Sequence, residues 1–358
     1  YCQSEVSLRF GYTVRQGVKW CVGCVMRIRS EMKNCIKCHE PSTVKGSEGD
    51  NVEYCDGCFM QMVTHKLRST IAKRRVFKDG APKEALIVNR NNDAQSVFLV
   101  EQMKRAIDME SHSRLVIQPT IVHLVSSSLP PSFPSHSLTL HLSRIFRPHG
   151  QSLLQENDSI EQNGRLSLLL STCPFPSSRN ELIRILQERL LLELSIELGV
   201  SSILVPDTAD DLAHLALSSL CLARGAQVSE MTNAVEKRKN CATIVRPLRD
   251  IRLSEIINAN RLFGWEYNKQ EREEGCRDSS VQSATHDFID TLHSEGFQST
   301  VSTVLSTSRK IHLDLSSNAV SCKLCLRQYN NDLSSLCPPC DYLLSQFPQR
   351  HLIDHLLV

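Results

Sequence analysis

The chain has 358 residues, 41% of them hydrophobic and 22% charged, and its formal net charge is +2. A chain of this length can bury a large core, and we expect two or more domains. The near-neutral charge excludes a uniformly basic protein, so any basic surface must be local. No run of about 18 apolar residues occurs, which excludes a membrane-spanning helix and a membrane partner. The chain starts at Tyr1 without a methionine or an apolar signal stretch, so we expect no secretory signal and treat the start as a fragment or as uncertain.

Cysteines are abundant and concentrated near the two ends of the chain. Ten of the fifteen form the Cys-x-x-Cys pairs Cys21/Cys24, Cys35/Cys38, Cys55/Cys58, Cys322/Cys325 and Cys337/Cys340. A secreted disulfide scaffold is usually short and spreads its cysteines along the whole chain. Clustering at the ends therefore indicates metal binding in a reducing compartment, and we expect a cytoplasmic protein.

The first cysteine module follows a segment, residues 1–34, whose pattern is hard to interpret. Its four cysteines are Cys35, Cys38, Cys55 and Cys58. Sixteen residues separate the two pairs, a spacing typical of zinc ribbons. We predict a ribbon over residues 35–60 with a structural zinc ion; a redox role and an iron–sulfur cluster are the alternatives. Cys21/Cys24 could replace one pair, although Cys35/Cys38 fits the spacing better.

Residues 59–75 are predicted to form a basic helix with an apolar stripe that recurs every four residues. The stripe consists of Phe59, Val63, Leu67 and Ile71. The candidate RNA contacts on this helix are Lys66, Arg68, Lys73, Arg74 and Arg75. Positive charge beside a zinc ribbon is typical of contact with a nucleic-acid backbone, and a solvated helix face is the alternative. Phe77 is the only aromatic residue of the basic stretch, so base stacking is not indicated.

Short apolar strands then alternate with helical patterns. We predict strands at residues 85–88, 114–125, 138–146, 202–205 and 242–245, and helices at residues 94–107, 180–199, 208–224, 253–262 and 281–294. Residues 148–179 are less regular and are expected to contain an insertion. This alternation predicts an α/β fold with a doubly wound, mostly parallel sheet covered by helices on both faces.

The loop at residues 89–93 lies where an α/β nucleotide-binding protein places its phosphate loop. Such loops need glycines so that backbone N–H groups can wrap a phosphate at the helix N-terminus. This loop contains Arg90 and three asparagines but no glycine, and Ser96 is the only hydroxyl nearby. ATP binding is therefore not expected.

A second basic cluster comes later in the chain and is expected to enlarge the RNA-binding surface. It comprises residues 237–239 with Arg246, Arg249 and Arg252. The acids Asp210 and Asp211 are interpreted as helix N-terminal residues favoured by the helix dipole, and the lone Cys173 as a loop thiol.

The second cysteine module lies near the C-terminus and is predicted to form another zinc ribbon, over residues 311–358. Its ligands are Cys322, Cys325, Cys337 and Cys340, with eleven residues between the pairs. The expected domain order is therefore an uncertain segment (1–34), a ribbon (35–60), an α/β domain that starts with the basic helix (61–310), and a second ribbon with a tail (311–358).

Three motifs and the order of modules give the chain a resemblance to a known family. The motifs are Val-Arg-Pro-Leu-Arg-Asp at residues 245–250, Asn-Arg-Leu-Phe at 260–263 and Ser-Thr-Val-Ser-Thr-Val at 299–304. With both cysteine modules, they resemble the cytoplasmic tRNA 2-thiolation protein 2 family. The resemblance implies a PP-loop ATPase-like fold of the adenine nucleotide alpha hydrolase-like type and a heterodimer with a catalytic PP-loop paralogue. It also implies action on the wobble uridine (U34) of tRNA, with sulfur supplied by a ubiquitin-like thiocarboxylated protein.

The departures from active relatives concern the catalytic motifs. Those relatives carry Ser-Gly-Gly-x-Asp-Ser in the phosphate loop, of which only Ser96 remains here. A mid-chain Cys-x-x-Cys is reduced to Cys173, and Val245 replaces the cysteine before Arg246-Pro247. The acidic motif at residues 206–211 is only partly kept. The resemblance therefore implies a non-catalytic subunit with no catalytic residue of its own. An active tRNA-adenylating sulfurtransferase and a zinc-ribbon interaction protein that does not act on RNA are the alternatives.

Overall fold

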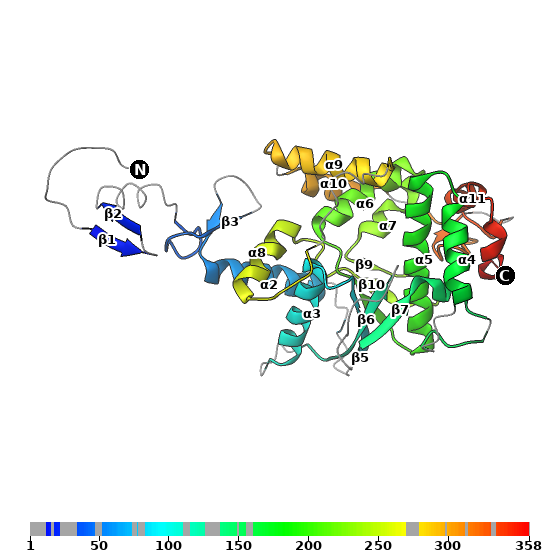
Figure 1. The fold of residues 1–358 in the computed structure, drawn as a ribbon, viewed down its shortest axis with the longest axis horizontal. Coiled ribbons are helices and arrows are strands. Elements are labelled where there is room, and N and C mark those ends of the chain that lie inside the picture. Colours follow the sequence, from blue (N-terminus) through cyan, green and yellow to red (C-terminus); the bar gives the residue numbers. More distant parts are fainter. Residues whose placement is uncertain are drawn as a thin grey trace. The chain divides into compact units, whose positions relative to one another are not determined.

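The computed structural model describes residues 12–15, 18–21, 34–46, 52–73, 77, 83–109, 115–125, 137–148, 150–154, 160–269, 279–297, 299–311, 314–330 and 334–357 (Figure 1). The chain divides into two compact units, Tyr1–Met62 and Val63–Val358. Every helix in the described ranges is too short or too polar to cross a lipid bilayer. The domain bounds expected from the sequence stay a prediction.

The first unit contains two small antiparallel hairpins and the start of a helix. The strands β1 (Tyr12–Arg15) and β2 (Val18–Cys21) form one hairpin, and β3 (Val44–Lys45) and β4 (Glu53–Tyr54) form the other. Helix α2 (Asp56–Lys73) begins here and continues into the second unit. Its first turn holds Asp56, whose charge suits the positive end of the helix dipole, so the helix begins three residues earlier than predicted. All four residues of the predicted apolar stripe are buried.

The second unit is built on a six-stranded sheet with strand order β7-β6-β5-β8-β10-β9. Its strands are β5 (Lys83–Asn89), β6 (Ile117–Val125), β7 (Ser137–His141), β8 (Ser202–Leu204), β9 (Val235–Glu236) and β10 (Thr243–Val245). All neighbours are parallel except β9, which pairs antiparallel with β10 at the edge. The predicted doubly wound, mostly parallel α/β sheet is confirmed. The strand order reverses between β5 and β8, and this reversal is where open α/β sheets place their ligands.

Helices connect these strands or follow the last of them along the chain. They are α3 (Ala94–Ile107), α4 (Ile160–Ser171), α5 (Pro176–Glu197), α6 (Ala209–Cys221), α7 (Val228–Thr232), α8 (Leu253–Phe263), α9 (Val281–Ser294) and α10 (Thr300–Ser308). The predicted helix at residues 94–107 has the observed bounds. Helix α4 lies in the stretch expected to be irregular, where Gly164 and three polar residues weaken a helical pattern whose buried residues are Gln162, Leu166 and Leu169.

The third predicted strand, residues 138–146, is wrong in its second half. The strand β7 ends at His141, and Leu142–Phe146 is the 3-10 helix η1. All five residues of η1 are buried, so the apolar run carries no alternation that would distinguish a strand from a short helix.

The C-terminal module contains β11 (Val320–Ser321), β12 (Gln328–Tyr329), α11 (Pro338–Ser345) and the 3-10 helix η3 (Arg350–Leu356). Its cysteines share one hydrophobic core with Leu182, Leu186 and Leu190 of α5. Figure 1 shows α11 beside α4 and α5. This module is therefore part of the core of the second unit.

Candidate functional site

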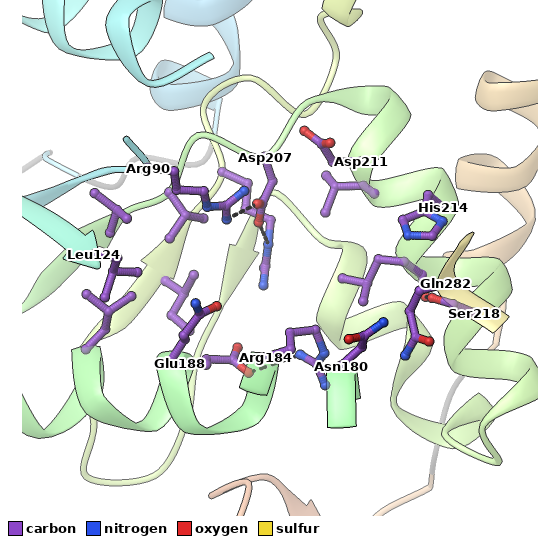
Figure 2. Close-up of a pocket in the computed structure, with 18 of the residues that line it drawn as sticks. Arg90, Leu124, Asn180, Arg184, Glu188, Asp207, Asp211, His214, Ser218 and Gln282 are labelled. Carbon is purple, nitrogen blue, oxygen red and sulfur yellow. Dashed lines mark hydrogen bonds and ion pairs between the residues drawn. The ribbon is translucent and has the colours of Figure 1, made fainter. Parts of the chain in front are cut away.

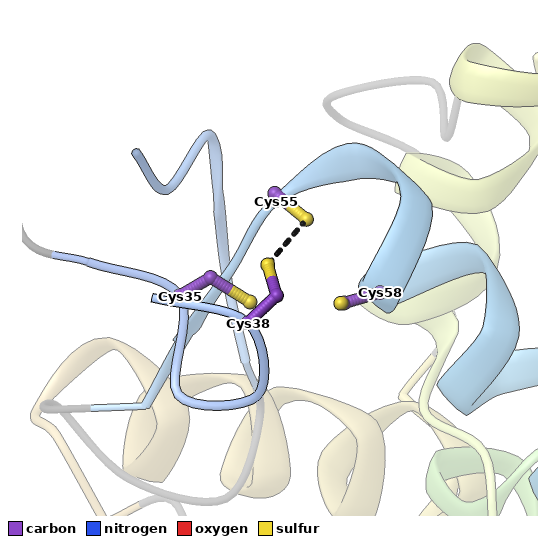
Figure 3. Close-up of side chains that lie close together, drawn as sticks. All are labelled: Cys35, Cys38, Cys55 and Cys58. Atoms are coloured by element: carbon purple, nitrogen blue, oxygen red, sulfur yellow. Dashed lines mark hydrogen bonds between the residues drawn. The ribbon is translucent and has the colours of Figure 1, made fainter. Parts of the chain in front are cut away.

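The N-terminal cysteines converge on one point (Figure 3). The Sγ atoms of Cys35, Cys38, Cys55 and Cys58 all lie within 4.8 Å of one another. Those of Cys38 and Cys55 are 3.5 Å apart. Cys35 is buried and Cys38 is exposed, so the cluster lies at a surface of the first unit.

The C-terminal cysteines converge in the same way, but all four are buried. The Sγ atoms of Cys322, Cys325, Cys337 and Cys340 lie within 4.8 Å of one another. Those of Cys325 and Cys337 are 3.8 Å apart. The predicted groupings of cysteines are thus brought together at both ends, whereas Cys24 and the side chain of Cys21 lie outside the described part of the structure.

The two clusters share one local design. In each first pair, a backbone N–H just after the second cysteine donates back to the carbonyl of the first: His39 to Cys35 (2.9 Å) and Leu326 to Cys322 (2.8 Å). Both donors have a left-handed backbone, with φ of 61° at His39 and 59° at Leu326. The second pair lies at the start of a helix in both modules, α2 and α11. A tight turn followed by a helix N-terminus therefore aims four thiols at one centre twice in this chain.

The sulfur geometry fits a single tetrahedral ion. With metal–sulfur bonds of about 2.3 Å, tetrahedral geometry places two thiolates roughly 3.8 Å apart. The Cys38–Cys55 and Cys325–Cys337 sulfur pairs, at 3.5 Å and 3.8 Å, agree with this spacing. In a four-iron cube each thiolate binds a different iron, which holds the sulfurs farther apart. Both clusters could therefore hold a single metal ion.

The thiol pKa values also reflect crowding of four acids at one point. Hydrogen bonds from Cys38 and Cys55 raise the pKa of Cys58 to about 12. The bond to Cys325 raises the pKa of Cys322, but bonds from Cys337 and Cys340 outweigh it and bring the value to about 7. The thiols cannot all ionise side by side, and a bound cation removes that obstacle.

The loop after β5 keeps a sharp bend without glycine. Asn91 and Asn92 adopt left-handed backbones, with φ of 52° and 54°. The side chain of Asn89 accepts from the Asn92 N–H (2.8 Å), and Asp93 accepts from the Ser96 N–H (2.8 Å) at the start of α3. The Arg90 N–H donates to the Ser96 hydroxyl oxygen (2.8 Å). Loop side chains thus satisfy these three N–H groups, and the Asp93 carboxylate places negative charge at the helix start.

Ion pairs fill the edge of the sheet where the strand order reverses (Figure 2). Arg90, after β5, contacts Asp207, after β8, at 2.5 Å. Arg246, after β10, contacts Asp207 at 3.2 Å and Glu236 at 2.7 Å. Burial alone would raise the pKa of Asp207, but Arg90 and Arg246 hold it below its ordinary value. The charges that would attract a nucleotide phosphate are already neutralised by side chains of the chain itself.

A cavity of about 360 Å³ remains next to these ion pairs. Arg90, Asp207 and Arg246 line one part, and His214, Ser218 and Gln282 line another. Burial raises the pKa of Asp211, which also closes a capping box with Thr208 at the start of α6. The interpretation of Asp211 as a helix N-terminal acid is confirmed. Asp210, also in the first turn of α6, binds Arg252 at 3.2 Å.

The ion pairs at the carboxyl edge of the sheet predict weak or absent nucleotide binding. We expect no saturable heat of ATP binding at micromolar concentrations, because Asp207 and Asp93 hold the arginine and the helix N-terminus that a phosphate would need. Isothermal titration calorimetry of the purified chain with Mg-ATP tests this. Micromolar binding that disappears in Arg90→Ala would contradict the closed cleft.

In the second predicted basic cluster, Lys237 and Lys239 are exposed, but three of its arginines are buried. Arg246 and Arg249 are 3% and 1% exposed, and Arg238 is 7% exposed. Their expected role in enlarging a basic surface is wrong, because each is paired inside the unit. No role was predicted for Glu188 and Glu236, although acids near arginine runs are a usable signal for such pairing.

A buried network links the C-terminal module to the cleft. Arg327, between the two cysteine pairs, contacts Glu188 at 2.8 Å and Glu236 at 3.0 Å. Arg238 contacts Glu236 at 2.6 Å and donates to the carbonyl of Cys325 at 3.0 Å. Arg246 joins the same Glu236 to Asp207. Burial would raise the pKa of Glu236, but Arg238, Arg327 and Arg246 lower it far below its ordinary value.

Replacing this carboxylate is expected to destabilise the fold. Glu236→Gln leaves buried arginines without their counter-charge, and we expect a loss of about 3–5 kcal/mol in the free energy of unfolding at pH 7. The folded pKa is lowered, so the stabilisation is present above the unfolded value near 4.3 and falls with pH below it, by about 1.4 kcal/mol per pH unit. Urea titrations at several pH values measure both effects. The exposed Glu266→Gln is the control, and equal stability of the two variants would refute the role of Glu236.

The predicted RNA contacts are only partly described. Lys66 forms an ion pair with Glu255 at 3.0 Å and keeps 20% of its side chain exposed. Arg68 donates to the sulfur of Met109. Lys73 ends α2, and Arg74 and Arg75 lie outside the described residues. Cys173 occupies a loop as expected and is buried in the core.

The two cysteine clusters differ in their surroundings, so the loss of a metal ion from each is expected to have different consequences. Cys55→Ser should remove one metal ion and unfold the small first unit locally, since metal binding supplies much of its folding energy. Cys337→Ser should remove the other ion and lower the melting temperature of the second unit, because its cysteines belong to that core. Elemental analysis for zinc and iron, with hydrogen exchange of residues 34–62 and of α5, tests both expectations.

The exposed Cys221→Ser is the matched control and should keep both ions. Well-folded wild-type protein without metal would contradict the assignment of both clusters. Equal loss of protection in α5 for Cys55→Ser and Cys337→Ser would contradict the contrast between them.

Comparison with known proteins adds three findings. A family model described as cytoplasmic tRNA 2-thiolation protein 2 matches residues 280–340. Relatives with that name from Caenorhabditis briggsae and Caenorhabditis elegans are 32% and 30% identical, over 82% and 85% of this chain and 88% and 92% of theirs. The solved U34-tRNA thiolase NcsA from Methanococcus maripaludis, with its [4Fe-4S] cluster, superposes with a TM-score of 0.58 at 14% identity. That superposition covers 87% of this chain and 96% of NcsA, and it supports the PP-loop-like fold.

Proposed function

Because this chain belongs to the cytoplasmic tRNA 2-thiolation protein 2 family, we propose that it is the non-catalytic subunit of a cytosolic complex that thiolates the wobble uridine of tRNA. In this role it binds a catalytic PP-loop paralogue as a heterodimer and supports binding of tRNA. A ubiquitin-like thiocarboxylated protein supplies the sulfur to the complex. The family name and the fold shared with a U34 thiolase support the reaction class.

The observation that carries the non-catalytic role is that ion pairs occupy the carboxyl edge of the sheet, where a nucleotide phosphate would bind. A phosphate needs free N–H groups and uncompensated positive charge at the carboxyl edge of the sheet. Here the Arg90–Asp207 pair at 2.5 Å and the Asp93 cap on α3 use both. A subunit with this edge would contribute surfaces to the complex, while the paralogue activates the uridine.

We propose that both cysteine clusters hold structural zinc. The four-thiolate donor set and the short sulfur separations support a single closed tetrahedral site, which leaves no position for a substrate. In the heterodimer the metal would fix the two ribbon modules. No step of sulfur transfer is assigned to these cysteines.

The basic end of α2 is proposed as a tRNA backbone contact through Lys66, Arg68, Lys73, Arg74 and Arg75. Lysine and arginine side chains on phosphates position an RNA without reading its sequence, and such contacts weaken as salt rises. The Lys66–Glu255 pair fixes the helix against α8, so Lys66 would contribute to phosphate contact only beside that carboxylate.

Charge reversal at the end of α2 tests the proposed function. The triple change Lys73→Glu, Arg74→Glu and Arg75→Glu should weaken tRNA binding by the heterodimer at least tenfold at moderate salt and flatten its salt dependence, because phosphate contacts are lost. Wobble-uridine thiolation in cells carrying the variant should fall, while metal content and paralogue binding stay unchanged. Filter-binding titrations at several salt concentrations and a thiolation-sensitive gel of cellular tRNA measure this.

Other outcomes separate the alternatives. Normal tRNA binding and normal thiolation in the triple variant would leave α2 as a solvated face. Thiolation by this chain without a paralogue would favour the active sulfurtransferase. Affinity purification that recovers neither a PP-loop subunit nor tRNA would favour an interaction protein that does not act on RNA.

A further inference from the structure

An aromatic and cationic cluster forms where the end of α8 meets the end of α3. Phe263 is the last residue of α8, and Gly264 adopts a left-handed conformation, with φ of 73°, that turns the chain back. The rings of Phe263 and Trp265 therefore stack, with centroids 4.4 Å apart and planes at 15°. The Arg105 guanidinium carbon lies 4.6 Å from the Phe263 centroid and 6.0 Å from that of Trp265. We call Arg105, Phe263 and Trp265 the stacking cluster.

The rings of the stacking cluster pack against a buried side chain and remain partly exposed to solvent. Trp265 packs edge-on against the fully buried Phe98, with centroids 6.0 Å apart. The backbone N–H of Trp265 donates to the carbonyl of Asn260 at 2.9 Å. Phe263 and Trp265 are themselves only partly buried, and Arg105 is exposed. A rigid pair of rings that still meets solvent suits a ligand with a flat face.

The charge of the cluster favours an anionic ligand. Arg105 pairs with no carboxylate in the part of the chain that the structure describes, and the aromatic rings hold its guanidinium in place. Arg68 of the basic helix reaches Met109, which follows Arg105 by four residues at the end of α3. A contact between α2 and the residue that follows α3 therefore lies only four residues along the chain from Arg105.

The stacking cluster also lies close in the chain to a segment that contacts the loop at residues 89–93. The segment that follows Trp265 crosses this loop, where Asn268 donates from its backbone to the carbonyl of Asn92 (2.8 Å) and from its side chain to that of Asn91 (2.7 Å). Thus one short segment carries a stacking surface and covers the carboxyl edge of the sheet.

We propose that the stacking cluster binds an unpaired nucleotide of tRNA, with the base against the aromatic pair and a phosphate near Arg105. Aromatic stacking with a neighbouring cation is how proteins hold unpaired RNA, and it accepts any base. This inference rests on the proposed function, and it adds base contacts to a surface that the basic helix alone would limit to phosphates.

The test uses the heterodimer and labelled tRNA. Phe263→Leu and Arg105→Gln should each weaken binding about tenfold, the loss of one stacked base. Phe263→Leu should leave the salt dependence unchanged, because it removes no charge. Trp265→Phe keeps a ring and should bind nearly as wild type, whereas Trp265→Leu should not. Lys104→Gln, on an exposed residue of the same helix turn, is the matched control and should change binding less than twofold.

Ultraviolet cross-linking followed by peptide mass spectrometry gives a direct readout, with tRNA joined to the peptide that contains residues 263–265. Wild-type affinity of Phe263→Leu without a cross-link there would overturn the proposal and leave the proposed function intact. Loss of the paralogue instead of tRNA would identify a protein interface and also overturn it. Failure of the wild-type heterodimer to bind tRNA would refute the proposed function itself.

Discussion

The second unit depends on one fully buried carboxylate, that of Glu236. A buried charge costs several kcal/mol unless it is paired with good geometry. Arg238, Arg246 and Arg327 all contact Glu236; the first follows β9, the second follows β10 and the third lies in the C-terminal cysteine module. Glu188 and Asp207 balance the excess of positive charge. The network therefore joins segments that are far apart in the sequence. Removing one of its members leaves another buried charge without its partner.

This network explains why the two cysteine modules, which share one local design, differ in what surrounds their cysteines. Both use a tight left-handed turn and a helix start to collect four thiols. Around the C-terminal cysteines, however, Arg327 and Arg238 carry the ion pairs to the sheet, and the leucines of α5 complete a shared core. The N-terminal module has the exposed Cys38 instead, and a metal ion bound there would stabilise only the small first unit. Paired Cys-x-x-Cys motifs thus serve a small separate unit at one end of the chain and the core of the second unit at the other.

Local patterns were sufficient for much of the fold and for the cysteine sites. Helix α3 and strand β5 were predictable because an amphipathic period and an apolar run lie on continuous sequence. The cysteine clusters were predictable because spacing alone restricts their geometry. Patterns could not distinguish η1 from a strand, since all its residues are buried, and they missed α4, whose helical face is interrupted by polar residues.

Charged and aromatic residues were the harder part, because their meaning depends on distant partners. Arg246 and Arg249 were expected at a surface, since arginine is usually exposed, yet Glu236 and other groups bury them. Base stacking was not indicated by the sequence around the basic helix, because Phe263 and Trp265 reach Arg105 only through the packing of α8 on α3. Residues that act through long-range pairs leave little local signal.

The loop at residues 89–93 keeps a sharp bend although it lacks the glycines with which such loops bind a phosphate. Asparagine tolerates the left-handed backbone at Asn91 and Asn92, so the bend persists without glycine. Asp93 and Ser96 satisfy N–H groups that a phosphate would otherwise bind, and Asn268 ties the loop to the segment after α8. Hydrogen bonds from the chain's own side chains therefore hold this loop, which leads from β5 into α3, next to the surfaces that we propose for tRNA.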